Sequence, residues 1–312
     1  MHKVVAVLGP TASGKSALAE QLASRLDGEL INSDASAVFA ELSVGVTKPD
    51  AVTRERIPYH LLDVTTLAQG YDLKTYLQQA ERAVQEIASR RRLPIVVGGS
   101  GLYARALLDG YRLPEIEVSP EIRVRVRGLA PPLALQELEN LDPAAYQRID
   151  RHNSRRVQRA LELALAVGGP VPPADRSERT DLSVLRLYLQ PALDLLMQRI
   201  EMRTVSMWEP WTEEVLDLEK KGLADWLGER KPIGYESVLA YNRGELARDE
   251  AIDQIVQLTK KLAKKQRTWL KKEAESALSH RFFYDCEEQW GGVNDRALQI
   301  VQGFLQGEDP EG

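Results

Sequence analysis

A glycine-rich loop near the start of the chain limits the possible folds more than any other feature. Residues 9–16 read Gly-Pro-Thr-Ala-Ser-Gly-Lys-Ser, which is the pattern G-x-x-x-x-G-K-[ST] of a phosphate-binding loop. An apolar run at 3–8 precedes the loop, and a helix-forming run at 16–23 follows it. Strand, loop and helix in this order point the N-terminus of the helix at an anion. The sequence therefore predicts a strand–loop–helix unit that binds phosphate.

The residues of this loop have distinct expected roles. Backbone N–H groups surround the phosphates, Lys15 adds a mobile positive charge, and the Ser16 hydroxyl can reach a Mg²⁺ ion. We therefore predict Mg²⁺ as a cofactor with Ser16 as its protein ligand. The motif specifies an anion and a metal, but it does not specify a nucleotide. The predicted phosphate-binding residues are Gly9, Pro10, Thr11, Ala12, Ser13, Gly14, Lys15 and Ser16.

Alternating strand and helix patterns in the first third of the chain predict an α/β fold. Strand-like runs lie at 29–33, within 57–64 and from 94, and the segment 72–92 carries its apolar residues near one helix face. Such alternation is typical of a parallel sheet with helices on both faces. We predict a P-loop NTPase-like parallel sheet flanked by helices. Later strand-like runs are found at 184–189 and 282–284, and the chain is otherwise helical from 191.

The middle of the chain has a different character. Residues 111–150 contain several prolines between short helical pieces and show no strand pattern. We predict that 111–150 form a small all-helical insertion domain. The predicted P-loop core then consists of residues 1–110 and 151–312, with the C-terminal helices.

Polar residues follow three predicted strands, and ligands of parallel α/β sheets bind at the carboxyl ends of strands. We therefore expect the phosphate loop, Asp34 and Ser100 to meet in one cleft. Asp34 is either a general base or metal ligand, or a turn residue that caps the next segment. The Gly98–Gly101 turn either approaches a ligand or only makes a tight connection. The loop Gly45–Pro49 either contributes to the anion site or is an ordinary surface loop.

Two basic clusters outweigh the overall charge of −5, which alone argues mildly against a nucleic-acid partner. One lies at 151–159. The other, at 260–272, has seven cations in thirteen residues and no acid. Phosphate backbones respond to such patches and not to total charge, so we predict contact with RNA phosphates. The alternative is that both are solvated helix faces.

Composition excludes several other classes. The single cysteine, Cys286, rules out an internal disulfide and the usual structural zinc sites. The short N-terminal apolar run leads directly into the phosphate loop and is predicted to be a core strand, not a signal peptide. No segment approaches the length of a membrane span. We expect a cytoplasmic protein without a membrane partner, acting as a monomer.

Further short motifs follow the phosphate loop in a fixed order up to residue 269. They are Asn32-Ser-Asp34, Gly45-x-x-Lys48-Pro49, Tyr59-His-Leu-Leu-Asp63, Gly98-Gly-Ser-Gly-Leu-Tyr103, Arg156-x-x-Arg159-Ala-Leu-Glu162, Arg199-Ile-Glu-x-Arg203, Ile233-Gly-Tyr235 and Lys264-Lys-Gln266-x-x-Trp269. This ordered set resembles the tRNA dimethylallyltransferase family, also called tRNA isopentenyltransferases, in its bacterial form. Two departures are Ser100, where the family usually has threonine, and Pro210-Trp211, where Gly-Leu is usual.

The resemblance implies transfer of a dimethylallyl group from its diphosphate to the exocyclic amine of the adenosine that follows the tRNA anticodon. Lys15 and Arg203 would hold the donor diphosphate, and Asp34 would accept a proton from the amine. Ser100 would orient the amine or the donor. Contacts with the anticodon stem-loop are implied for Asp34, Ala35, Ser36, Ala37, Ser100, Arg123, Arg155, Arg156, Val157, Gln158, Arg159, Lys231, Gly234, Lys264 and Lys265.

Three other readings are weighed against this one. A small-molecule kinase could use the same phosphate loop to bind ATP. An adenylate isopentenyltransferase, which makes cytokinins, would prenylate a free nucleotide. The basic helices favour tRNA over a free nucleotide, because a free nucleotide offers only a few phosphates to neutralise. A complete phosphate loop together with Asp34 argues against a non-catalytic RNA-binding protein.

Overall fold

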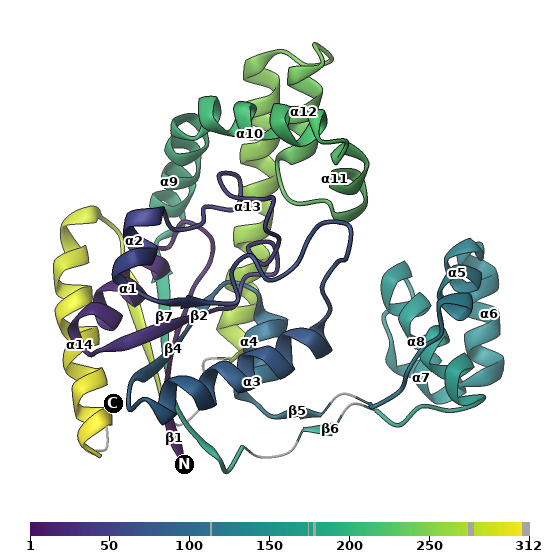
Figure 1. Ribbon diagram of the computed structural model, residues 1–312, viewed down its shortest axis with the longest axis horizontal. Coiled ribbons are helices and arrows are strands. Elements are labelled where there is room, and N and C mark those ends of the chain that lie inside the picture. Colours follow the sequence, from purple (N-terminus) through teal and green to yellow (C-terminus); the bar gives the residue numbers. More distant parts are fainter. Residues whose placement is uncertain (113, 174, 177–178, 274–277, 308–312) are drawn as a thin grey trace. The chain divides into compact units, whose positions relative to one another are not determined.

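The computed structural model describes residues 1–312 apart from 113, 174, 177–178, 274–277 and 308–312 (Figure 1). The chain divides into two compact units. The first combines Met1–Asp109 with Glu178–Gly312, and the second is Gly110–Ser177.

A six-stranded parallel sheet forms the centre of the first unit. Its strand order is β3-β2-β4-β1-β7-β8, and every neighbouring pair is parallel. This arrangement confirms the predicted fold class. The strands are β1 (His2–Leu8), β2 (Gly28–Asn32), β3 (Tyr59–His60), β4 (Leu93–Gly98), β7 (Leu182–Pro191) and β8 (Ser279–Tyr284).

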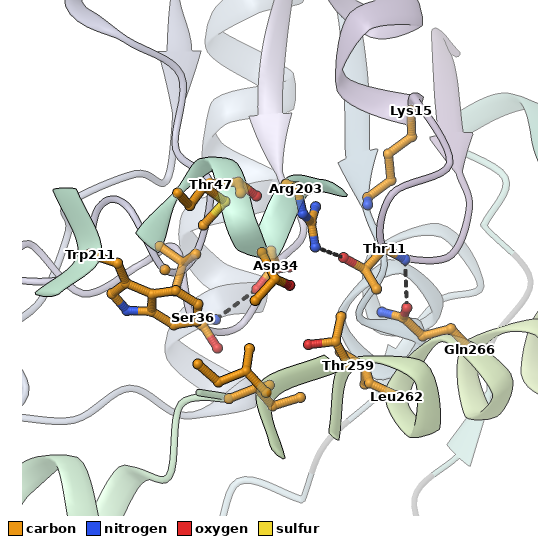
Figure 2. A pocket seen from close by; sticks show the side chains of 16 residues that line it. Thr11, Lys15, Asp34, Ser36, Thr47, Arg203, Trp211, Thr259, Leu262 and Gln266 are labelled. Carbon is orange, nitrogen blue, oxygen red and sulfur yellow. Dashed lines mark hydrogen bonds between the residues drawn. The ribbon is translucent and has the colours of Figure 1, made fainter. Parts of the chain in front are cut away.

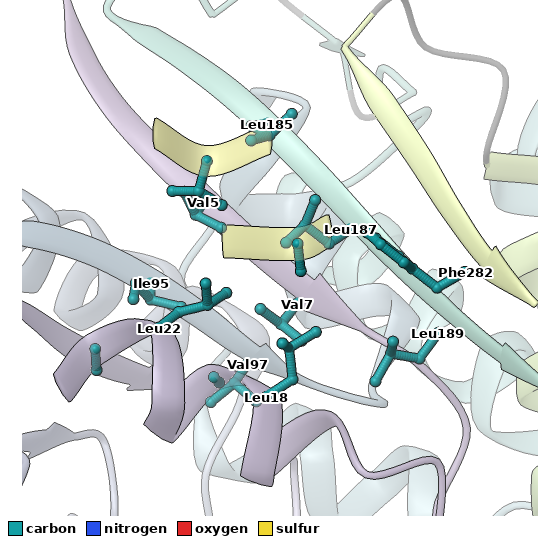
Figure 3. Packing of buried hydrophobic residues seen from close by; sticks show 14 of the residues in the cluster. Val5, Val7, Leu18, Leu22, Ile95, Val97, Leu185, Leu187, Leu189 and Phe282 are labelled. Atoms are coloured by element: carbon teal, nitrogen blue, oxygen red, sulfur yellow. The ribbon is translucent and has the colours of Figure 1, made fainter. Parts of the chain in front are cut away.

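Helices cover both faces of this sheet because its central strands are buried on both sides. Successive side chains of a strand point to opposite faces. In β1, Val5 and Val7 join a core with α1 (Lys15–Arg25) and α14 (Trp290–Gln306), as Figure 3 shows in part. Val4 and Ala6 join a second core with α3 (Leu73–Ser89) and α4 (Gly101–Leu108). Each fully buried aliphatic side chain stabilises the fold by about 1.5–3 kcal/mol.

A further layer of helices has its own core in the first unit. Trp208, Tyr235 and Ile255 are fully buried there, together with Phe39 and Leu42 from the segment after β2. This layer therefore packs on the loops that follow the strands. Its helices are α9 (Leu193–Ser206), α10 (Trp208–Lys220), α11 (Ala224–Arg230), α12 (Tyr235–Asn242) and α13 (Arg248–Glu273), and the short α2 (Ala51–Arg56) follows Asp50.

The second unit is larger than the sequence predicts. Its helix α8 (Ser154–Val167) packs Val157, Leu161 and Ala164 against α5 (Pro120–Gly128) and α6 (Pro131–Leu141). Helix α8 therefore belongs to this unit and not to the P-loop core. The predicted limits 111–150 are therefore wrong. The prediction of no strand there is also wrong, because β5 (Tyr111–Arg112) pairs antiparallel with β6 (Asp175–Arg176). Helix α7 (Pro143–Arg148) also belongs to this unit.

Within the described residues, none of the helices combines the length and the apolar character that crossing a bilayer would require.

Candidate active site

One pocket of the first unit brings together most of the predicted catalytic side chains (Figure 2). Lys15 at the start of α1, Asp34 after β2 and Arg203 from α9 all line it. Its wall thus carries two cations and one carboxylate. The rest of the lining is largely apolar or hydroxylated: Thr11, Ser36, Gly45, Val46, Thr47, Thr204, Met207, Trp211, Ile233, Ile255, Thr259, Leu262 and Gln266.

The phosphate loop has the backbone shape that an anion requires. Ala12 and Gly14 adopt left-handed conformations, with φ of 63° and 77°. The Ser13 N–H donates to the Pro10 carbonyl at 3.2 Å, which closes a tight turn. Left-handed residues between others turn successive N–H groups toward one concave side, and α1 begins there with its own free N–H groups. The backbone of the predicted loop therefore has the shape of an anion-binding nest.

Two cations flank this nest from different elements. The Lys15 ammonium lies 3.3 Å from the Pro10 carbonyl oxygen, and the Arg203 guanidinium donates to the Thr11 hydroxyl at 2.9 Å (Figure 2). Burial lowers the pKa of Lys15 to about 8; the charge of Asp34 opposes this shift and that of Arg203 adds to it. Burial also lowers the pKa of Arg203, again opposed by Asp34. When Lys15 and Arg203 are both protonated, the pocket wall carries two positive charges and one carboxylate, so it is suited to an anion.

Asp34 lies in a turn held by buried Asn32. The Asn32 Oδ1 accepts from the Asp34 N–H, and its Nδ2 donates to the carbonyls of Asp34 and Leu61, each at 3.0 Å. The Asp34 Oδ1 accepts the Ser36 N–H at 2.9 Å. No hydrogen bond to the other carboxylate oxygen comes from the residues that the structure describes. That oxygen is free to accept a proton from a molecule in the pocket.

Ser100 lies beside Asp34 but does not line the pocket. Its hydroxyl accepts the Ala35 N–H at 3.1 Å, and its own N–H donates to the Ser33 carbonyl at 3.2 Å. A Cβ atom on Gly98, two residues before Ser100, would lie 2.2 Å from the Ser33 oxygen, so glycine is needed for this close approach. In the structure Ser100 therefore supports the turn that carries Asp34. Its direct contact with amine or donor stays a prediction.

The loop Gly45–Pro49 contributes to the pocket, but not through its charge. Gly45, Val46 and Thr47 line the cavity. The Lys48 ammonium instead lies 2.5 Å from Asp63 Oδ1 and donates to the Phe39 carbonyl. Burial lowers the pKa of Lys48, and its contact with Asp63 opposes that shift. Lys48 thus holds the loop in place, and its charge is paired with Asp63 and does not contribute to the anion site.

A second set of contacts holds this loop in place and was not predicted from the sequence. Glu214 of α10 accepts the N–H groups of Ser43 and Val44 at 3.0 and 2.6 Å, and the Tyr235 hydroxyl donates to its other oxygen at 2.5 Å. A Cβ atom on Gly45 would lie 2.4 Å from the Trp211 ring. The only sequence signals were Tyr235, which ends a family motif, and the departure at Trp211.

A role for Gln266 of α13 was not predicted either, although this residue belongs to the motif Lys264-Lys-Gln266-x-x-Trp269. Its Oε1 accepts the Thr11 N–H at 2.8 Å, and its Nε2 donates to the Gly99 carbonyl at 3.0 Å. One amide therefore joins the phosphate loop to the turn after β4, and it also lines the pocket (Figure 2).

The predicted RNA contacts differ in exposure. The structure contradicts the predicted RNA contacts of Ala37 and Val157. These residues are only 5% and 3% exposed among other buried hydrophobic residues, so their side chains are not available to an RNA. Gly234 is buried against the Trp211 ring with φ of 89°. The exposed cations are Lys231, Lys264 and Lys265 in the first unit and Arg123, Arg155, Arg156 and Arg159 in the second; Gln158 is half-buried, and the side chain of Lys272 in the basic cluster lies outside the described residues.

Two cations and a carboxylate beside a phosphate-loop motif, in a partly apolar pocket, are the features of a group-transfer enzyme on a P-loop-like fold. Residues 37–273 match the family described as IPP transferase. A tRNA dimethylallyltransferase of Thermomicrobium roseum is 36% identical over 99% of this chain and 93% of that protein. The chain therefore belongs to the IPP transferase family of prenyl-transferring enzymes, which confirms the resemblance drawn from its motifs.

Solved structures agree with this assignment. The tRNA isopentenylpyrophosphate transferase of Bacillus halodurans is 28% identical, with a TM-score of 0.67 over 98% of this chain and 96% of that one. A eukaryotic dimethylallyltransferase acting on tRNA is 24% identical and has a TM-score of 0.83, over 99% of this chain and 80% of that one. The second likeness supports the fold alone.

Proposed function

We propose that this enzyme transfers the dimethylallyl group of dimethylallyl diphosphate to the exocyclic amine of the adenosine 3′-adjacent to the anticodon in tRNA. One observation carries the proposal: Lys15, Arg203 and Asp34 line the same partly apolar pocket. A diphosphate needs cations, a five-carbon chain needs apolar surface, and a weakly basic amine needs a proton acceptor. The pocket offers all three, and the curated relative supports the choice of tRNA as acceptor.

The donor would place its diphosphate in the nest of residues 9–16. Lys15 and Arg203 would neutralise it from two sides, while the allylic chain would lie along apolar residues such as Met207 and Ile255. The described residues hold no cluster of three or more acidic, histidine or cysteine side chains that could bind a metal. Ser16 is exposed in the first turn of α1, and a lone hydroxyl suits a Mg²⁺ ion that takes its other ligands from phosphate and water. Such an ion would neutralise charge on the leaving group.

The transfer breaks the bond between the allylic carbon and the diphosphate oxygen, whose electron pair leaves with the diphosphate. The adenine nitrogen forms a new bond to that carbon and gives up one proton. Asp34 would accept this proton through its free carboxylate oxygen. Lys15 and Arg203 act where negative charge grows, which is where fixed cations stabilise a transition state most. The adenine is stacked in an anticodon loop, so it would have to be flipped out of the stack to reach Asp34.

The function is tested by supplying radiolabelled dimethylallyl diphosphate and Mg²⁺ with unmodified tRNA, AMP or ATP. We expect label in tRNA alone. Label in AMP but not in tRNA would replace the proposal by an adenylate isopentenyltransferase. ATP turnover without prenyl transfer would instead indicate a kinase.

The pKa of Lys15 predicts a pH dependence of donor binding. The ammonium binds the diphosphate and the free amine does not, so affinity for inorganic pyrophosphate should be high below pH 8 and fall as the pH rises through about 8. Binding at pH 8–9 should also take up a proton, measurable by calorimetry in buffers of different ionisation enthalpy. Lys15→Arg is the control, because a guanidinium stays charged throughout this range. A flat profile for the wild-type protein would contradict the role of Lys15.

The exposed lysines of α13 predict a salt effect on tRNA binding. Lys264→Ala with Lys265→Ala should weaken binding and reduce the slope of log K against log salt by about 1–2, since each lost phosphate contact removes close to one unit. The matched control is Lys220→Ala with Lys221→Ala, two exposed lysines at the end of α10. Equal slopes in both double variants would make this part of α13 a solvated face.

A further inference from the structure

The outer side of the phosphate loop is held by residues that the sequence analysis did not connect with it. Tyr284 ends β8, is 3% exposed, and donates its hydroxyl to the Ser13 carbonyl. Trp290 begins α14, and a Cβ atom on Gly14 would lie 2.6 Å from its ring. The two aromatic rings meet edge to face, with centroids 5.5 Å apart. The last strand and the last helix therefore touch two consecutive loop residues.

Arg199 ties this contact to α9. Its guanidinium lies 5.4 Å from the Tyr284 ring centroid and 5.9 Å from that of Trp290, and it donates to the Ala12 carbonyl at 3.4 Å. Glu287 fixes it with two hydrogen bonds of 2.7 and 2.6 Å. One turn of α9 further on, Arg203 contacts Thr11 on the pocket side. The loop thus has a pocket side, where the donor would bind, and an outer side against which the Tyr284 and Trp290 rings pack.

We propose that Tyr284 and Trp290 are positioning residues that hold the phosphate loop in its anion-binding shape before the donor arrives. The nest requires N–H groups that face inward and carbonyls that face outward. On the outer side the carbonyls of Ala12 and Ser13 already have partners, in Arg199 and Tyr284. Ala12 is a non-glycine residue with φ of 63°, a conformation that persists where surrounding contacts enforce it. The diphosphate then binds without the cost of ordering the loop.

This inference rests on the proposed function only in placing the donor diphosphate in the loop. The test measures binding of inorganic pyrophosphate with Mg²⁺ to the full chain by calorimetry. Tyr284→Phe removes one hydrogen bond, so its Kd should rise about 2- to 10-fold. Trp290→Leu, which removes the ring against Gly14, should weaken binding at least as much. The KM for the donor should rise in parallel, while kcat at saturating donor and the KM for tRNA stay near the wild-type values.

The control is Phe283→Leu, on the same strand but 68% exposed, which should bind pyrophosphate normally. Unchanged pyrophosphate affinity in both Tyr284→Phe and Trp290→Leu would overturn the inference, even if their melting temperatures fall, because the contacts would then stabilise the fold alone. A wild-type protein that binds no pyrophosphate would overturn the proposed donor site as well. The two failures are therefore distinguished by the wild-type titration.

Discussion

Replacing Asp34 by asparagine is expected to lower kcat by about 10²–10⁴-fold, the usual contribution of a positioned general base. An amide oxygen cannot take the proton that the adenine amine loses. Asparagine is nearly the same size and keeps the Oδ1 atom that accepts the Ser36 N–H, so the turn should be preserved. The measurement is single-turnover prenyl transfer to unmodified tRNA, with tRNA affinity determined separately. We expect the tRNA Kd to stay close to the wild-type value.

Asp50→Asn is the matched control. Asp50 also accepts a backbone N–H in a turn, from Thr53 at 2.7 Å, but it lies outside the pocket. Its substitution should leave turnover unchanged. If Asp34→Asn instead weakened tRNA binding strongly and left the rate of bound substrate intact, Asp34 would be an RNA contact and not the base.

Replacing Lys15 by methionine should lower kcat/KM for dimethylallyl diphosphate by about 10²–10³-fold, the typical cost of removing one preorganised group that stabilises transition-state charge. Methionine keeps most of the aliphatic stem and removes the ammonium, which lies beside the Pro10 carbonyl and interacts with the charge of Asp34. The loss should be larger in kcat/KM for the donor than in the tRNA Kd, because the RNA does not contact this charge in the proposed complex. Steady-state kinetics with varied donor provides the measurement.

Lys221→Met is the comparison for the lost charge. This lysine is exposed just after the end of α10 and pairs with Asp217, an interaction worth little. Its substitution should leave both constants unchanged. Near-normal donor kinetics in Lys15→Met would mean that the diphosphate does not occupy the loop.

Much of the fold was predictable because its signals are local. The strand, loop and helix around residues 9–16 lie within one short stretch, and the apolar strands alternate with helices along the chain. The meeting of Lys15 and Asp34 also followed from sequence, since parallel strands bring their carboxyl ends to one edge. Arg203 required the family motif, because nothing in its own helix pattern directs it to the loop.

The remaining features depend on contacts between distant segments. The periodic apolar stripe of α8 predicts a buried face but not the core against which that face packs. For this reason the predicted insertion domain ended too early, at residue 150. Gln266 meets the loop across 255 residues and Tyr284 across 271. A polar or aromatic side chain has the same local pattern whether it faces water or another segment. The pairing of Lys48 with Asp63 was hidden for the same reason.

The most direct test of the account is to locate the product on the RNA. Unmodified tRNA is treated with the enzyme and dimethylallyl diphosphate, digested with nucleases and analysed by mass spectrometry. The account predicts one dimethylallyl group on the exocyclic nitrogen of the adenosine 3′-adjacent to the anticodon, and none when Asp34→Asn replaces the wild-type enzyme over the same time. A prenyl group at any other position, or equal yields from the two enzymes, would contradict it.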